Sequence, residues 1–230
     1  MNPWATCFKE NKYLETIRFP QNGIRPDGIV DILRNGIVYD TQLQILDLQD
    51  NTFTLKGALV LAEILPKLQK LKDLGVGDCL LSSRGGRAVA ESLKKGDNTD
   101  LEWVRLQYNE IELLGAREFY TAARLGLPKL KMIEFNGNKF AEDDDVVEDF
   151  RMLFVQRGYG EMDELDDMEE VSEDEEENEE EDEGLGEDAV AAQDIIRKET
   201  EEEEDEIVPQ EADKETDELA DMLAKAKIDG

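Results

Sequence analysis

The chain has 230 residues, and its 58 Asp and Glu outnumber its 26 Lys and Arg, which gives a formal net charge of −32 at pH 7. It contains no His, so His general bases, His metal ligands and Ser/His or Cys/His triads are excluded. The charge is uneven, because residues 1–160 carry 21 basic and 24 acidic side chains, whereas residues 161–230 carry 5 and 34. A near-neutral stretch that can bury one core is therefore joined to an acidic stretch that cannot.

Several further classes of protein do not fit. Cys7 and Cys79 lie far apart and form no CxxC pair, so neither a disulfide scaffold nor a zinc cluster is supported. No phosphate-binding GxxxxGK[ST] or GxGxxG motif occurs, and no apolar run approaches the roughly 20 residues that cross a bilayer. We expect a soluble intracellular protein without cofactor or metal, and the acidic balance argues against direct binding of nucleic acid or membranes.

Residues 1–12 open the chain with a helical pattern and no strand pattern. From residue 14 onward the sequence repeats with a period of about 29 residues, as described below. Trp4 and Phe8 lie one such period before Leu33 and Ile37. These first residues are therefore expected to form the helix of a unit whose strand is missing. Under this hypothesis the chain is N-terminally truncated, the C-terminal part of a longer repeat protein. The alternative is a genuine start whose first strand edge is covered by a partner chain.

From residue 14 onward, a pattern of the form LxxLxLxxNxL recurs five times. It begins at Leu14, Leu43, Leu71, Leu101 and Leu130, which is a period of about 29 residues. The alternating LxL residues indicate a short strand with one buried face, and the second half of each unit predicts the crossover helix that parallel strands need. The pattern predicts an α/β solenoid with a parallel sheet on its concave face and helices on its convex face.

The ninth position of the pattern lies in the turn after each strand. It is Asn in every unit but one, where Cys79 replaces it. An Asn side chain there is predicted to satisfy backbone groups that no neighbouring strand reaches. Cys79 is expected to be a buried, unreactive turn residue, and burial is also the default expectation for Cys7.

After the fifth strand, residues 146–154 carry a helical apolar stripe, preceded by acidic residues that favour a helix N-terminus. We expect a capping helix that ends near Gly158, so that the array of five strand units occupies residues 1–160. Residues 161–230 are expected to be an acidic, mostly disordered tail with a short helix over 216–228. Ser172 is a candidate site for an acidophilic kinase, the alternative being an unmodified serine.

Next to the array, Met162, Leu165, Met168 and Val171 recur every three residues within the acidic sequence. Apolar residues at this spacing are candidates for docking on the last helix or on a partner.

Strand residues that point away from the core should line the concave face. Charges of both signs, together with an aromatic residue, suit a protein-binding surface there. The candidate partner-binding residues are Arg18, Asp47, Gln49, Asp73, Trp103, Arg105, Glu134 and Asn136. Trp103 is the strongest candidate for a partner contact. The alternative is that the side chains of Arg105 and Gln107 cover it in part. No residue is predicted to be catalytic, because the abundant carboxylates fit a solvated rim better than a paired acid and base.

The chain resembles the later repeats and tail junction of fungal Ran GTPase-activating proteins in four segments, LDLQDNTFT (46–54), RLQYNEIE (105–112), NGNKF (136–140) and GEMDELDDM (160–168). The likeness covers about residues 4–171. The repeat unit, of about 28–30 residues, is similar to the ribonuclease-inhibitor type of leucine-rich repeat that this family uses.

This resemblance implies a crescent of leucine-rich repeats that binds Ran in its GTP form. It also implies an activator that works in trans, without an arginine finger, by ordering the catalytic glutamine of the GTPase. A role in nucleocytoplasmic transport, a cytoplasmic location that can extend to the nucleus or nuclear envelope, a monomeric parent protein and a Ran-binding protein as a second partner follow from the same resemblance. The family's residues that approach the nucleotide belong to earlier repeats, so none is assigned here.

Two other functions stay open. The first is an acidic leucine-rich repeat binding module, or a chaperone for basic proteins such as histones, although such proteins generally use shorter units of about 22–25 residues. The second is an inhibitor or adaptor scaffold built from the same type of repeat.

Overall fold

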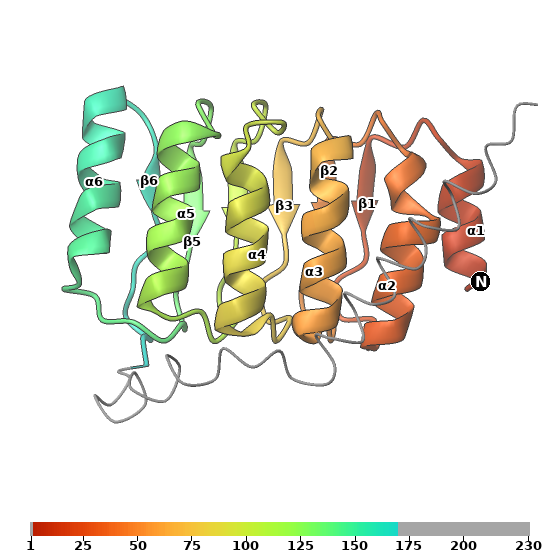
Figure 1. Ribbon diagram of the computed structural model, residues 1–230, viewed down its shortest axis with the longest axis horizontal. Coiled ribbons are helices and arrows are strands. Elements are labelled where there is room, and N and C mark those ends of the chain that lie inside the picture. Colours follow the sequence, from red (N-terminus) through yellow and green to blue (C-terminus); the bar gives the residue numbers. More distant parts are fainter. Residues whose placement is uncertain (1, 170–230) are drawn as a thin grey trace, which may run out of the picture. The chain divides into compact units, whose positions relative to one another are not determined.

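The computed structural model describes residues 2–169, all of which lie in the first of the two units into which the chain divides, Met1–Ala189. The described residues form one parallel sheet whose six strands follow one another in sequence order. The strands are β1 (Thr16–Arg18), β2 (Ile45–Asp47), β3 (Asp73–Gly75), β4 (Trp103–Arg105), β5 (Met132–Glu134) and β6 (Glu161–Met162). The helices are α1 (Pro3–Glu10), α2 (Pro26–Asn35), α3 (Thr54–Ile64), α4 (Ser82–Lys94), α5 (Leu113–Leu125) and α6 (Asp145–Arg157), with short 3-10 helices η1 (Ile37–Tyr39) and η2 (Leu65–Lys67). Figure 1 shows the helices side by side in one layer that covers one face of the sheet.

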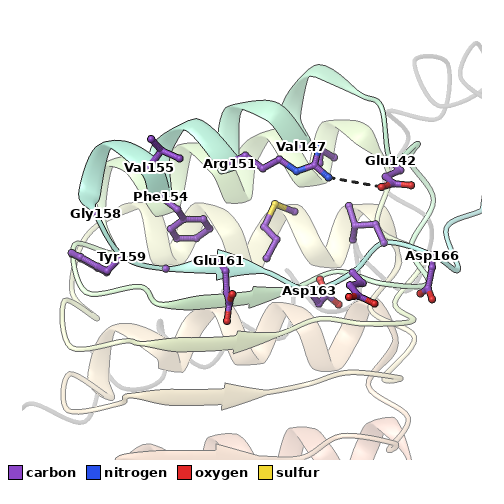
Figure 2. A pocket seen from close by; sticks show the side chains of 14 residues that line it. Glu142, Val147, Arg151, Phe154, Val155, Gly158, Tyr159, Glu161, Asp163 and Asp166 are labelled. Atoms are coloured by element: carbon purple, nitrogen blue, oxygen red, sulfur yellow. Dashed lines mark ion pairs between the residues drawn. The ribbon is translucent and has the colours of Figure 1, made fainter.

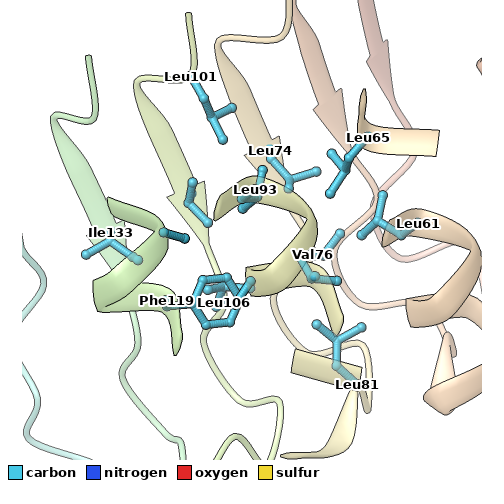
Figure 3. Packing of buried hydrophobic residues seen from close by; sticks show 14 of the residues in the cluster. Leu61, Leu65, Leu74, Val76, Leu81, Leu93, Leu101, Leu106, Phe119 and Ile133 are labelled. Carbon is cyan, nitrogen blue, oxygen red and sulfur yellow. The ribbon is translucent and has the colours of Figure 1, made fainter. Parts of the chain in front are cut away.

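The middle residue of each of the first five strands points into the core beneath the helices. Ile17, Leu46, Leu74, Val104 and Ile133 are paired in register and are all buried. Each buried side chain of this kind contributes about 1.5–3 kcal/mol, so a continuous row of them stabilises the whole stack. Figure 3 shows how helix and strand side chains interleave in this core. The predicted α/β solenoid of leucine-rich repeats is confirmed.

Buried Asn side chains bridge the turns that follow the strands. Asn109 donates from Nδ2 to the carbonyl oxygens of Val76 and Leu106, at 2.8 and 3.0 Å, and its Oδ1 accepts two backbone N–H groups of the preceding unit. Asn51 and Asn138 make the same kinds of bonds in their own units. The predicted role of the ninth position is therefore confirmed.

The two cysteines differ in their surroundings. Cys79 is buried, with its Sγ 3.4 Å from the carbonyl oxygen of Leu48 and 3.3 Å from that of Gly77. Burial raises the pKa of the Cys79 thiol to about 12, so the reactive thiolate is not populated at neutral pH, as predicted. Cys7 is exposed, and the expectation that it is buried was wrong. It precedes the buried Phe8 by one residue, so the helix turns it away from the core.

The residue before each ninth position has a left-handed backbone. Gln21, Asp50, Asp78, Tyr108 and Gly137 have φ angles of 56°, 56°, 50°, 54° and 73°. Such angles are uncommon outside glycine, but their recurrence in all five units assigns them to the turn of the repeat rather than to one strained site. At Gly137 a side chain is also excluded by space, because a Cβ there would lie 2.2 Å from the ring of Tyr108.

Helix α1 confirms the helix expected near the start of the chain. The side chain of Asn2 caps it by accepting a hydrogen bond from the backbone N–H of Trp4 at 3.0 Å. The ring of Phe19, which follows β1, lies 4.8 Å from that of Trp4 and 5.5 Å from that of Phe8, measured between ring centroids. This aromatic cluster joins α1 to β1. Whether further repeats precede α1 stays a prediction.

Helix α6 is the predicted capping helix, and it ends at Gly158, whose N–H donates to the carbonyl oxygen of Phe154 at 3.0 Å. The array nevertheless continues beyond residue 160. Glu161–Met162 forms β6, which pairs with β5, and Leu165 is buried against the core. The predicted boundary at residue 160, with five strand units, is therefore too early, because these apolar residues cover the open end of the core. The predicted helix over 216–228 and Ser172 lie outside the described residues.

Candidate partner-binding surface

The first and third residues of each strand lie on the face of the sheet opposite the helices, here called the strand face. Two rows cross it in register, and in chain order they are Thr16, Ile45, Asp73, Trp103, Met132, Glu161 and Arg18, Asp47, Gly75, Arg105, Glu134. Six of the eight candidate residues stand in these rows, and the other two, Gln49 and Asn136, follow β2 and β5 by two residues. The strand face therefore brings the predicted residues onto one surface.

Three of them form an ion-pair network at the centre of this face. Arg105 binds Asp73 through two parallel contacts, Nη1 to Oδ1 at 2.5 Å and Nη2 to Oδ2 at 3.1 Å. Its Nε lies 3.6 Å from Oε1 of Glu134, and Gln107 donates from Nε2 to the same carboxylate. Asp73 is buried, and the side chains of Arg105 and Glu134 are mostly covered. These charges are thus paired within the sheet before any partner arrives.

The network also sets the ionisation of its members. Burial works against the charge of Arg105, but the hydrogen bond and charge of Asp73, with smaller contributions from Glu134 and Asp47, raise the pKa of the guanidinium. Burial raises the pKa of Glu134, and the nearby Arg105 and Gln107 offset this in part. A carboxylate pair poised for acid and base chemistry needs a substrate site beside it. Here both carboxylates face the Arg105 guanidinium, so they share one positive charge.

Two glycines open space beside the network. A Cβ on Gly75 would lie 3.1 Å from Oδ1 of Asp47, and one on Gly77 would lie 2.9 Å from Oε1 of Gln107 and 3.0 Å from Oε1 of Gln49. Gln49 in turn donates from Nε2 to Oδ1 of Asp47 at 3.1 Å. Side chains at the end of β2 and in the residues after β2 and β4 therefore lie over the backbone at Gly75 and Gly77, and hydrogen-bond acceptors gather there.

Trp103 and Arg18 are the candidates that remain accessible. The Trp103 side chain lies between Asp73 and Met132 in its row, and 37% of the residue is exposed. Arg18 is exposed on β1. An aromatic side chain and an arginine at the surface are the types that anchor protein interfaces.

Asn136 has a different environment from the one predicted. Its Oδ1 accepts the backbone N–H of Asp167 at 2.9 Å, and its Nδ2 donates to Asp166 at 3.2 Å. The hydroxyl of Tyr108 donates to the Asp167 carboxylate at 2.9 Å. The segment after β6 thus occupies Asn136, and sequence reasoning missed this contact. The three-residue spacing of apolar residues in that segment was the available signal.

Within residues 2–169, no cluster of three or more Cys, Asp or Glu side chains could hold a metal ion. The described helices include none that is long and apolar enough to cross a membrane.

Comparison with known proteins places these features in context. No family model matches the chain. Over 138 residues, which are 59% of this chain and 34% of the relative, it is 36% identical to Ran GTPase-activating protein 1 of Saccharomyces cerevisiae. The two chains are related. The match confirms the resemblance that the repeat segments gave, and this chain spans about a third of that relative's length.

Two solved structures are also similar. The structure titled leiomodin-1 actin-binding site 2 superposes with a TM-score of 0.57 at 14% identity, covering 67% of this chain and 87% of that one. A protein of Bacteroides fragilis matches with a TM-score of 0.47 at 18% identity, over 69% of this chain and 42% of its own. With so few identical residues, the first likeness shows a shared fold and nothing of function.

Proposed function

We propose that this chain is part of a GTPase-activating protein that acts in trans on a Ran-type small GTPase in its GTP form. The observation that carries the proposal is the 36% identity with Ran GTPase-activating protein 1 over 138 residues. Because the chain corresponds to about a third of that relative, activity of the chain by itself is a separate question.

The geometry of the strand face is consistent with a binding role rather than with catalysis by the chain. Trp103 and Arg18 are exposed on this face, and the charges of Asp73, Arg105 and Glu134 are paired within it. Side chains that are already held by ion pairs have less conformational freedom to lose when a partner binds. We propose that the chain contributes docking contacts and that the catalytic glutamine belongs to the GTPase.

Further parts of the proposal come from the resemblance alone. They are a role in nucleocytoplasmic transport, a cytoplasmic location that can extend to the nucleus or nuclear envelope, a Ran-binding protein as a second partner and a monomeric parent protein.

The test combines a binding and a kinetic measurement. Binding of the chain to Ran loaded with a non-hydrolysable GTP analogue is compared with binding to GDP-loaded Ran and to core histones. Single-turnover GTP hydrolysis is then measured with Ran alone, with the chain, and with the chain fused behind the preceding part of the yeast relative. Preferential binding of the GTP form and acceleration by the fusion support the proposal. Binding of histones but of neither form of Ran would establish the acidic binding module instead.

A further inference from the structure

A groove opens at the C-terminal end of the array, between α6 and the segment that follows it (Figure 2). Its volume is about 710 Å³. A second hollow of about 490 Å³ shares Glu142, Arg151, Leu165 and Asp166 with the first, so the two lie next to each other at this end.

The floor of the groove is apolar. Phe154 of α6 and Leu165 of the following segment are almost fully buried there, and Met162 is partly buried. Among the described residues, α6 packs against α5 on one side and no further helix covers its other side. Two apolar residues of α6 are consequently left at the surface, Val155 with 73% exposed and Met152 with 47%. Of these two, Val155 also lines the groove, so one exposed apolar side chain stands at its edge. Exposed apolar groups beside a groove are typical of sites of interaction.

The rim of the groove is acidic. The two hollows are lined by the acidic residues Glu142, Asp143, Glu161, Glu164 and Asp166, and by one cation, Arg151. Asp163 also lines the groove, but its carboxylate is bound by the backbone N–H groups of Phe135 and Asn136. Arg151 reaches Glu142 at 3.9 Å and so neutralises little of this charge. The field at the rim attracts cationic groups and repels anionic ones.

We propose that this groove binds a basic segment of a partner protein, whose apolar side chains enter the floor while its Lys or Arg side chains meet the rim. A second copy of the chain is a poor occupant, because two chains that each carry a net charge of −32 repel each other. The groove borders the strand face, because Glu161 stands in the row of Trp103 with Met132 between them, whereas Val155 of α6 lies outside that row. A variant of Val155 therefore tests the groove apart from the proposed GTPase contact.

The experiment uses the full chain and three short fluorescent peptides, one of Lys and Leu, one with each Leu replaced by Ser, and one with each Lys replaced by Glu. Fluorescence anisotropy gives the Kd of each. Any cationic peptide is also attracted to the acidic sequence after residue 169, which stays the same in every variant. The Leu-containing basic peptide is expected to bind at least about tenfold more tightly than either control peptide.

Protein variants then locate the binding. The double reversal Glu161→Lys/Glu164→Lys and the single change Val155→Asp are each expected to weaken binding of the basic Leu peptide at least about tenfold. The matched reversal Glu10→Lys/Glu91→Lys, at exposed positions of α1 and α4, changes net charge equally and should alter it less than about twofold. Because all five positions are exposed, folding should persist, and circular dichroism confirms it.

Two outcomes overturn the proposal. Equal weakening by both double reversals would show that only overall charge attracts the peptide. A concentration-dependent dimer in analytical ultracentrifugation that Val155→Asp abolishes would show that the groove is occupied by a second copy.

Discussion

The carboxylate of Asp163 accepts a hydrogen bond from the backbone N–H of Phe135 at 2.8 Å, and also one from the N–H of Asn136 at 2.9 Å. Elsewhere in the sheet the equivalent N–H donates to a backbone carbonyl of the next strand, as Leu106 does to Glu134 at 2.8 Å. After β6 there is no such carbonyl in reach, and a side chain replaces it. Asp163 thereby ends the hydrogen-bonding ladder of the sheet.

Replacing Asp163 by Ala should destabilise the array by about 2 kcal/mol, because two partly buried N–H groups lose their acceptors. Asp163→Asn should cost less, since its single amide oxygen can still accept one of the two bonds. Urea unfolding followed by circular dichroism measures both, with the exposed Asp143→Ala as control. Equal stability of Asp163→Ala and Asp143→Ala would contradict the capping role.

A second buried carboxyl, Asp40, is expected to weaken the fold at neutral pH. Its Oδ1 accepts the N–H of Gln42 at 3.1 Å, while its buried Oδ2 has no partner among the described residues. Asn98 occupies the same position in its own unit, three residues before the first Leu, and donates from Nδ2 to the carbonyl oxygens of Leu65 and Leu68 at 2.8 and 2.9 Å. Asp40→Asn should therefore raise stability at pH 7 by about 1 kcal/mol.

The pH dependence of the stability difference between the original protein and Asp40→Asn follows from the pKa of Asp40. Burial raises this pKa above its usual 3.8, and the hydrogen bond from the N–H of Gln42 offsets the effect in part. The folded state holds the Asp40 proton more tightly than the unfolded chain does. The stability that this bound proton contributes is fully present below about pH 3.8, and it is lost as the pH rises through the pKa of Asp40 in the folded state. The advantage of Asp40→Asn should thus shrink toward acid pH. Thermal melts of both proteins between pH 3 and pH 7 would refute this by showing a constant difference.

Repeats made most of the fold predictable, because five units in phase place Leu46 and Leu74 in register without any three-dimensional information. The Asn109 bridges follow from the same periodicity, since a residue fixed relative to the strand meets the same backbone groups in each unit. Strand β6 escaped prediction because it is two residues long and lies in acidic sequence, where neither LxL nor the ninth-position Asn marks it.

The candidate surface was predicted as a set of positions and not as a network. Alternation in β3 and β4 places Asp73 and Arg105 on the strand face, but their pairing depends on the diagonal offset between neighbouring strands and on side-chain length. The spacing of Met162, Leu165 and Met168 indicates that the segment after β6 docks, but it does not say that Asn136 accepts the backbone N–H of Asp167.

Removing the Arg105 guanidinium should lower the stability of the folded protein. Arg105→Ala leaves Asp73 and Glu134 mostly covered and unpaired, which should cost about 2–3 kcal/mol after allowance for their partial exposure. Arg105→Lys should recover only part of this, because an ammonium cannot make the two parallel contacts. Chemical denaturation gives the free energy of unfolding of the original protein and of both variants. A loss below about 0.5 kcal/mol would show that the pair is only a surface contact.

Trp103→Ala should separate binding from folding. Because 37% of Trp103 is exposed, its loss should lower thermal stability little, whereas the affinity for GTP-loaded Ran should fall at least about tenfold if the residue is an anchor. Arg18→Ala should have a smaller effect, and Lys56→Ala on α3 serves as a control away from the strand face. Biolayer interferometry gives the affinities. If the affinity of Trp103→Ala is unchanged, Trp103 is not part of the binding surface.

Truncation distinguishes the role of β6 from that of the acidic sequence beyond it. A chain ending at residue 160 loses β6, the Asp163 carboxylate and the buried Leu165, so β5 becomes an open edge beside an uncovered core. Exposed strand edges pair readily between molecules, and we expect this protein to aggregate. A chain ending at residue 169 keeps all three features and should remain monodisperse in light scattering.

If both truncated chains aggregate, the charge of residues 170–230 is what keeps the array soluble. If residues 1–160 form a monodisperse monomer, β6 is dispensable for closing the array.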